Sequence, residues 1–163
     1  MTSIIDVHLS LWELFRERTL GTLKAIEALP DPLRALGWRP GPGRAHIAWQ
    51  MMHIGITEEL FATERFLGTA PGYPDLLPRF RGGSTPDANI PTPNQIRDVL
   101  ANTRQHLRNT LCSLTERDLD TIPAALKERG LSIGKALQIL GWHEAHHQGQ
   151  AHITLNLFRA SQS

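Results

Sequence analysis

The chain has 163 residues, a length that fits one domain over residues 1–163, and 40% of them are hydrophobic, enough to close a core and to exclude a disordered chain. Seventeen lysines and arginines against sixteen aspartates and glutamates leave a net charge of +1, which gives nucleic acids and acidic membrane surfaces no electrostatic basis for binding. A single cysteine, Cys112, excludes an intramolecular disulfide and a cysteine-based zinc knuckle, and we expect it to be a buried small hydrophobe.

Two stretches with helical periodicity come first in the chain. Residues 4–29 carry apolar side chains at spacings of three and four, and Pro30 ends this pattern. Residues 37–43 are rich in glycine and proline and predict a turn-rich linker. The second helical stretch follows over residues 45–67 and is closed by Gly68.

A long connection separates the second helix from the third. Residues 68–93 contain six prolines and four glycines, so we expect no regular element there. A loop of this length in a compact domain commonly lines or covers a site. The third helix begins at Thr92, a cap residue followed by proline, and runs to about residue 114. Residues 115–130 then form a polar connector with room for a short extra turn.

The last helix runs from the N-cap Ser132 to about residue 158. No segment of the chain alternates apolar and polar residues for long, so strands are not expected. Four amphipathic helices predict an all-α fold, a four-helix bundle with long loops between helices. The order in which the helices pack is left open by the long linkers.

His143 and His147 are the strongest chemical signal in the sequence. They lie four residues apart in the last helix, share its apolar stripe and are expected to point into the core. Core histidines bonded to neighbouring helices would account for them, but two imidazoles at this spacing favour a metal ion. His53 lies in the apolar stripe of the second helix and is the natural third ligand. Three histidines leave positions for water, which is typical of a catalytic metal.

The other histidines have simpler interpretations. His146 is expected to flank the site, and solvated or capping roles suffice for His8, His46, His106 and His152. The sequence His143-Glu144-Ala145-His146-His147 also matches the metalloprotease motif H-E-x-x-H. We discount a protease because Gln150 and Ile153 replace the residues of the longer motif, and no acidic residue follows Glu144.

Two motifs together resemble the DinB/YfiT-like superfamily of metal-binding four-helix bundles. The first is the segment from Ile47 to Ile54, with Glu58 and Glu59 following, and the second is His143-x-x-x-His147-Gln148-Gly149-Gln150. The resemblance spans nearly the whole chain. It implies that His53, His143 and His147 hold a divalent metal, such as zinc, nickel or an iron-like ion. In the second motif, we expect Gly149 to allow close approach of a neighbouring helix and Gln150 to form a hydrogen bond near the site.

The resemblance also implies a homodimer in a cytoplasmic setting that acts on a small-molecule substrate. We expect neither a nucleic acid nor a membrane as partner, because the charge balance gives no support for either. The first residues lack the basic start and apolar run of a signal peptide, and no stretch is long and apolar enough to span a bilayer. Characterised relatives include transferases and isomerases that use a low-molecular-weight thiol such as bacillithiol, mycothiol or glutathione.

Three functions therefore remain open. In a thiol S-transferase, the metal would supply a thiolate. Arg79 and Arg81 in the long loop are candidates for attracting an anionic thiol, although solvated loop charges are the favoured interpretation of both. In a metal-dependent hydrolase, Glu144 or another carboxylate would move the proton, although the helical position of Glu144 also allows it to face a neighbouring helix or solvent. The third function is non-catalytic, a metal-binding, stress-associated protein that acts through its dimer surface.

Overall fold

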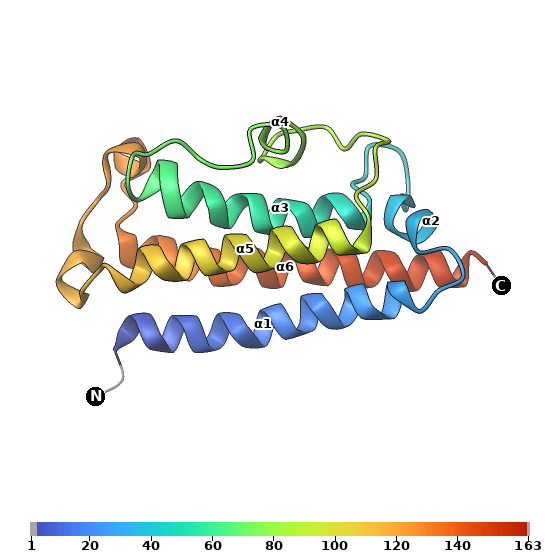
Figure 1. The fold of residues 1–163 in the computed structure, drawn as a ribbon, viewed down its shortest axis with the longest axis horizontal. Coiled ribbons are helices and arrows are strands. Elements are labelled where there is room, and N and C mark those ends of the chain that lie inside the picture. The colour runs from blue at the N-terminus through green and yellow to red at the C-terminus, as the bar shows by residue number, and fades with distance from the viewer. Residues whose placement is uncertain (1–2, 163) are drawn as a thin grey trace.

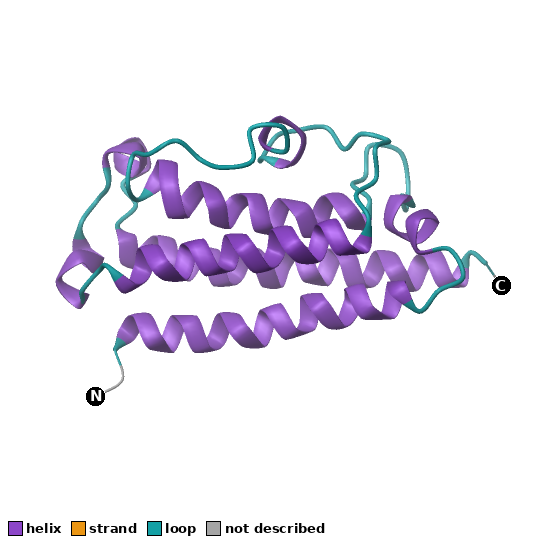
Figure 2. Ribbon diagram, in the orientation of Figure 1, coloured by secondary structure: helices purple, strands orange, loops and turns teal. Residues whose placement is uncertain are grey.

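The structure is a computed structural model that describes residues 3–162, and it is built from four long helices. These are α1 (Ile4–Glu27), α3 (Ile47–Leu60), α5 (Pro93–Cys112) and α6 (Ile133–Ala160), and they lie side by side (Figure 1). Shorter helical elements occupy the connections: α2 (Pro32–Gly37), η1 (Phe61–Arg65), α4 (Leu77–Phe80), η2 (Glu116–Asp120) and η3 (Ala124–Arg129). Figure 2 shows only helices and loops within the described residues, so the all-α prediction is confirmed. Within the same residues, no helix combines the length and apolar character needed to cross a membrane.

The helix starts follow the sequence closely. Thr92 caps α5 in a reciprocal capping box with Gln95, and Pro93 occupies the first turn. The side chain of Ser132 accepts a hydrogen bond from the backbone of Lys135 and caps α6. Both predicted caps are therefore confirmed, because local hydrogen bonding decides where these helices begin.

The directions of the helices explain the long connection. In Figure 1, α1 and α6 run one way along the molecule, and α3 and α5 run the other way. Helix α3 packs against α5 and α6, whereas α1 packs mainly against α6, so α1 and α3 lie diagonally opposite. Because α3 and α5 are parallel neighbours, the chain between them has to return along the length of α3. Residues 66–92 make this return.

The sequence analysis missed two short helices. We expected no regular element over residues 68–93, but α4 forms a single turn there, and its Phe80 is buried against the core. The prolines after the first helix also begin a new one, because Asp31 caps α2 and Pro32 occupies its first turn. Proline stops a preceding helix and starts a following one equally well, so its presence alone does not distinguish a linker from a short helix.

Helix α3 differs most from its predicted form. The sequence indicated an amphipathic helix, but every residue of α3 is buried, because α5, α6 and the connection over residues 66–92 cover it. The helix was also expected to run to residue 67, whereas it changes at Phe61 into the π-helical turn η1. The polar residues of α3 must therefore find partners inside the protein.

Two single-residue expectations were wrong. Cys112 is exposed at the end of α5, because its side of the last helical turn faces solvent. Gly149 has open space around its missing side chain among the described residues, so no helix approaches it closely. The close approach lies instead at Gly141, where an added Cβ would stand 2.9 Å from Nε1 of Trp12.

Candidate metal centre

Three histidine rings meet between α3 and α6. His53 lies in α3, and His143 and His147 lie one turn apart in α6. One ligand nitrogen of each ring lies within 4.8 Å of the other two, and the Nε2 atoms of His53 and His143 are 3.0 Å apart. The structure thus brings together the three histidines that the sequence singled out, with His53 buried and the other two half-buried.

The geometry and charge state of the rings fit a divalent ion. Two nitrogens that bind one zinc ion at about 2.0–2.1 Å lie roughly 3 Å apart, close to the observed separation. Burial, and then the neighbouring rings His147 and His53, lower the pKa of His143 to about 2. Burial lowers the pKa of His147 to about 3, with His53 next in effect. The rings are therefore neutral at pH 7 and offer lone pairs, as metal ligands must.

Hydrogen bonds fix which nitrogen of two rings faces the centre. Nδ1 of His53 donates to the carbonyl oxygen of Phe80 at 2.6 Å. Nδ1 of His147 donates to Oε1 of Gln50, and the amide of Gln50 donates in turn to Gln150 at 2.8 Å. Both rings are left with a lone pair on Nε2, which is the usual arrangement around a protein-bound metal. The expected hydrogen bond of Gln150 near the site is confirmed.

The indole of Trp49 supports the centre from the other side of His53. The two rings stack at 4.5 Å with an interplanar angle of 16°. Nε1 of Trp49 donates to the carbonyl oxygen of Arg79 at 3.1 Å and to Oγ of Ser84 at 3.0 Å. The connection over residues 66–92 is therefore bonded to the same face of α3 that carries His53, and it helps to cover the centre.

Sequence reasoning missed two of these supporting groups. Gln50 lies three residues before His53, and this helical spacing was a usable signal that both share a face. The carbonyl of Phe80 carries no sequence signal, because its position depends on the path of the loop.

Glu144 lies between the two histidines in sequence but joins a different cluster. Its carboxylate is buried and bonds to Arg16 at 2.8 Å, to Arg104 and to the hydroxyl of Thr19 at 2.9 Å. Glu58 bonds to the same two arginines, at 2.9 Å and 2.5 Å. We call Arg16, Glu58, Arg104 and Glu144 the charge quartet; each comes from a different long helix. Both oxygens of Glu144 are thus engaged away from the centre.

Two members of the quartet, Glu58 and Arg16, are held in their charged forms by their partners. Burial alone raises the pKa of Glu58, but the positive charges of Arg16 and Arg104 outweigh it, and the net pKa is lowered. Burial alone would lower the pKa of Arg16. The negative charges of Glu58 and Glu144 outweigh this effect, and the net pKa is raised. The opposite charges of the quartet thus lie in direct contact inside the core, which offsets the cost of burying Glu58 and Arg16.

The remaining histidines have local roles. The Nδ1 atom of His46 caps α3, so the capping role predicted for this residue is confirmed. The solvated role is not, because His46 is buried. His146 is exposed beside the centre, as predicted, and stacks on Trp142. His106 bonds to the buried carboxylate of Glu59 at 2.9 Å.

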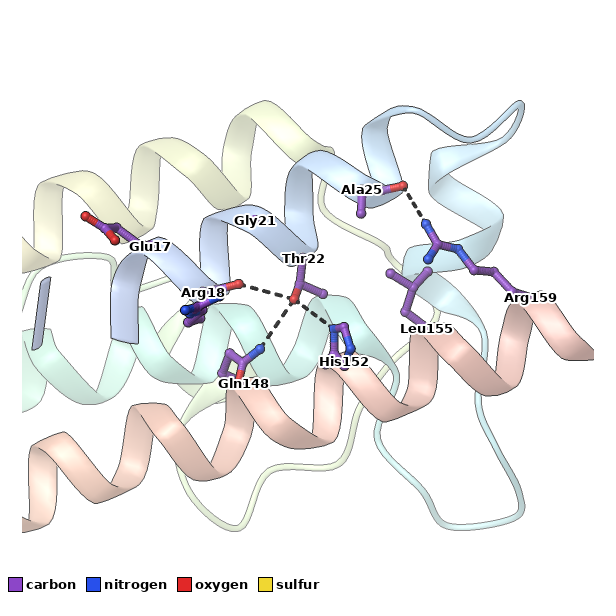
Figure 3. A pocket seen from close by; sticks show the side chains of 9 residues that line it. All are labelled: Glu17, Arg18, Gly21, Thr22, Ala25, Gln148, His152, Leu155 and Arg159. Atoms are coloured by element: carbon purple, nitrogen blue, oxygen red, sulfur yellow. Dashed lines mark hydrogen bonds between the residues drawn. The ribbon is translucent and has the colours of Figure 1, made fainter. Parts of the chain in front are cut away.

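A groove between α1 and α6 is a separate feature (Figure 3). It encloses about 360 Å³, and Thr22 lies at its middle, within 3.4 Å of Gln148 and 3.5 Å of His152. At one end, Arg159 donates to the carbonyl of Ala25. None of the three clustered histidines lines this groove.

A smaller pocket, of about 230 Å³, opens onto the centre and is lined by His53 and His143. A small molecule in this pocket would lie beside two of the three rings. The two loop arginines considered from sequence do not line this pocket. Arg79 pairs with Asp87 at 2.7 Å, and the side chain of Arg81 is exposed.

Comparison with known proteins agrees with the resemblance seen in the sequence. The DinB superfamily matches residues 11–151, a segment that includes His53, His143 and His147. No curated protein and no solved structure matches the chain significantly. The family match covers most of the sequence, all the long helices contribute to it, and the chain therefore belongs to the DinB superfamily.

Proposed function

We propose that this protein holds a divalent metal ion, of the zinc, nickel or iron type, through His53, His143 and His147, and that it acts there on a small molecule. The observation that carries the proposal is the convergence of three neutral imidazoles beside a pocket that solvent can enter. A divalent ion at this position would lower the pKa of a thiol or a water molecule that binds to it.

S-transfer from a low-molecular-weight thiol is the reaction that we favour. The family resemblance includes such transferases, and the pocket admits a small cosubstrate. The thiol must come from outside, because Cys112 is exposed at the end of α5 and does not line the pocket. In this reaction the chain holds the three imidazoles neutral and oriented through Phe80 and Gln50, and its apolar side chains limit access of water.

Hydrolysis by the same centre receives less support. It needs a group that moves a proton, and Glu144, the candidate from sequence, is engaged by Arg16 and Arg104. We therefore assign Glu144 to the charge quartet and give it no role in the reaction.

We also propose that the protein is a cytoplasmic homodimer. Ile4, Val7, Leu11 and Leu14 form an apolar stripe along α1, with 44–57% of each side chain exposed. Burying this stripe against a second copy would remove apolar surface from water. Sedimentation of the wild type should give twice the chain mass, and Leu11→Glu should give the monomer.

The first experiment measures metal content. Protein stripped of metal and reconstituted separately with zinc, nickel and cobalt is expected to hold one ion per chain, by elemental analysis. His53→Ala and His147→Ala should each fall below about 0.1 ion per chain, whereas the exposed His152→Ala should keep one. Less than about 0.1 ion in the wild type would reject the centre, and a shared proton would then explain the 3.0 Å contact between His53 and His143.

The second experiment tests the reaction. Metal-loaded protein is offered a panel of electrophiles with and without bacillithiol, mycothiol or glutathione. Turnover that requires a thiol supports S-transfer, and turnover with water alone rejects it in favour of hydrolysis. Full metal loading without any turnover would favour a metal-binding protein without catalytic activity.

A further inference from the structure

The pocket beside the three histidines is lined by imidazoles, apolar side chains and arginines. His53 and His143 form one part of it, and its volume of about 230 Å³ is below the roughly 300–1,000 Å³ of drug-sized sites. It therefore suits a molecule of few atoms. The other lining residues include apolar side chains, Phe61, Leu131, Ile139 and Trp142, and two arginines, Arg65 and Arg129.

The two arginines reach the pocket from different elements. Arg65 is the last residue of η1, and Arg129 is the last residue of η3. Neither forms an ion pair with a carboxylate anywhere between residues 3 and 162. The guanidinium of Arg65 lies 4.3 Å above the ring of Phe61, which holds it at the pocket wall. Arg16, Arg79 and Arg104, in contrast, all have carboxylate partners.

The charges around the pocket are mainly positive. Burial, and then the positive charges of Arg129 and Arg81, lower the pKa of Arg65, and only its sequence neighbour Glu64 opposes them. The charge of Arg65 contributes in turn to the lowered pKa of His53 and of His143. Positive charge therefore accumulates around this pocket, and a bound anion would reduce the repulsion.

We propose that the small molecule bound beside the three-histidine centre carries a carboxylate, and that Arg65 and Arg129 bind this group. The reactive end then faces His53 and His143, and a short hydrocarbon segment lies along the apolar wall. This inference rests on the proposed function, because it names the substrate class of the same site. The carboxylate belongs either to the thiol or to the second substrate, and the experiment below separates the two.

Two thiols that differ in charge test the proposal. Cobalt-loaded protein is titrated with 3-mercaptopropionate and with 2-mercaptoethanol, and the thiolate-to-cobalt absorption band gives each dissociation constant. We expect the carboxylate to improve binding about tenfold at low salt, and much less at about 1 M salt. Arg65→Gln and Arg129→Gln should each lower the affinity for 3-mercaptopropionate about threefold to tenfold and leave 2-mercaptoethanol unchanged.

Two matched variants separate charge from structure. Arg65→Lys keeps the positive charge and should retain part of the preference, which guards against misfolding of Arg65→Gln. Arg44→Gln removes an exposed arginine just before α3, at the opposite end of that helix from Arg65, and should change neither dissociation constant. Succinate added to the complex with 2-mercaptoethanol locates the carboxylate: binding without loss of the band assigns it to the second substrate, and displacement of the thiol assigns it to the thiol.

The outcomes distinguish this proposal from the proposed function. If neither thiol gives the thiolate-to-cobalt absorption band, thiol chemistry at the centre is rejected. The two arginines are then tested in metal-free protein. In metal-free protein, 3-mercaptopropionate should shift the side-chain Nε–H resonances of Arg65 and Arg129 saturably, and 2-mercaptoethanol should not. Equal affinity for both thiols with these shifts present would assign the carboxylate to the second substrate, and absence of these shifts would overturn the carboxylate proposal.

Discussion

The charge quartet and the three-histidine centre are both polar clusters inside the same helical core, and they differ in how their groups are paired. In the quartet, each charge lies within 2.9 Å of an opposite charge. In the centre, three like groups turn nitrogens toward one another, and His53 and His143 approach to 3.0 Å. A cluster of paired opposite charges holds helices together, whereas nitrogens that face one another have the arrangement that metal ligands need.

The two clusters are interleaved along one helix. His143 and Glu144 are consecutive in α6, and successive residues of a helix point about 100° apart. His143 therefore meets His53 of α3, while Glu144 meets Arg16 of α1 and Arg104 of α5. The same stretch of sequence thus contributes to both clusters.

Breaking the quartet should have the largest effect on stability. Arg16→Met leaves two buried carboxylates with one guanidinium, and we expect a loss of about 3–5 kcal/mol in the free energy of unfolding, measured with denaturant. Arg97→Met is the control, because Arg97 pairs with Glu27 near the surface and should cost under about 1 kcal/mol. Similar losses for both variants would contradict a structural role for the quartet.

Removing a histidine should instead affect the response to metal. At a free metal concentration of about 100 times the dissociation constant, zinc should stabilise the wild type by roughly 2.7 kcal/mol and His143→Ala not at all. Without metal, His143→Ala should cost less than Arg16→Met, because it leaves no unpaired charge behind. Thermal unfolding with and without zinc measures both effects. A metal-free loss as large as that of Arg16→Met would assign the histidines a structural role.

Loss of the hydrogen bond from His147 to Gln50 should have an intermediate effect. Gln50→Leu removes the acceptor of Nδ1 of His147, and we expect the metal affinity to fall about 10–100-fold with one ion per chain still bound at saturation. Competition with a chelator measures the affinity. Gln105→Leu, an exposed position of α5, is the control and should bind as the wild type does. Unchanged affinity in Gln50→Leu would exclude the proposed support.

The smallest expected effect is a change in the pKa of one group, Glu58. Arg16→Met should raise the pKa of Glu58, because it removes a cation that lowers it, and carbon NMR of the carboxyl group measures the change. In the wild type, the folded pKa lies below the ordinary value of 4.5, so the stability that Glu58 contributes is present above pH 4.5 and is lost as the pH falls through the folded pKa. The variant should therefore lose less stability in acid, and an unchanged pKa would contradict the pairing.

Local sequence patterns were enough to predict the long helices and one side of the centre. Local signals sufficed for the caps Thr92 and Ser132, since a cap side chain bonds to backbone two or three residues away. The spacing of His143 and His147 placed both rings on one face, because helical geometry is fixed. The third ring, His53, was inferred from its apolar stripe and from the family resemblance.

The groups that surround these rings depend on how the helices pack, and local sequence patterns do not reveal them. Arg16 and Arg104 come from separate helices, and nothing near them in sequence shows that they meet Glu144 in the core. The carbonyl of Phe80 reaches His53 because parallel α3 and α5 force residues 66–92 to return over α3. Periodicity describes which face of a helix is apolar, but the partner of a buried polar group depends on which helices pack together, and that choice is made by the whole chain at once.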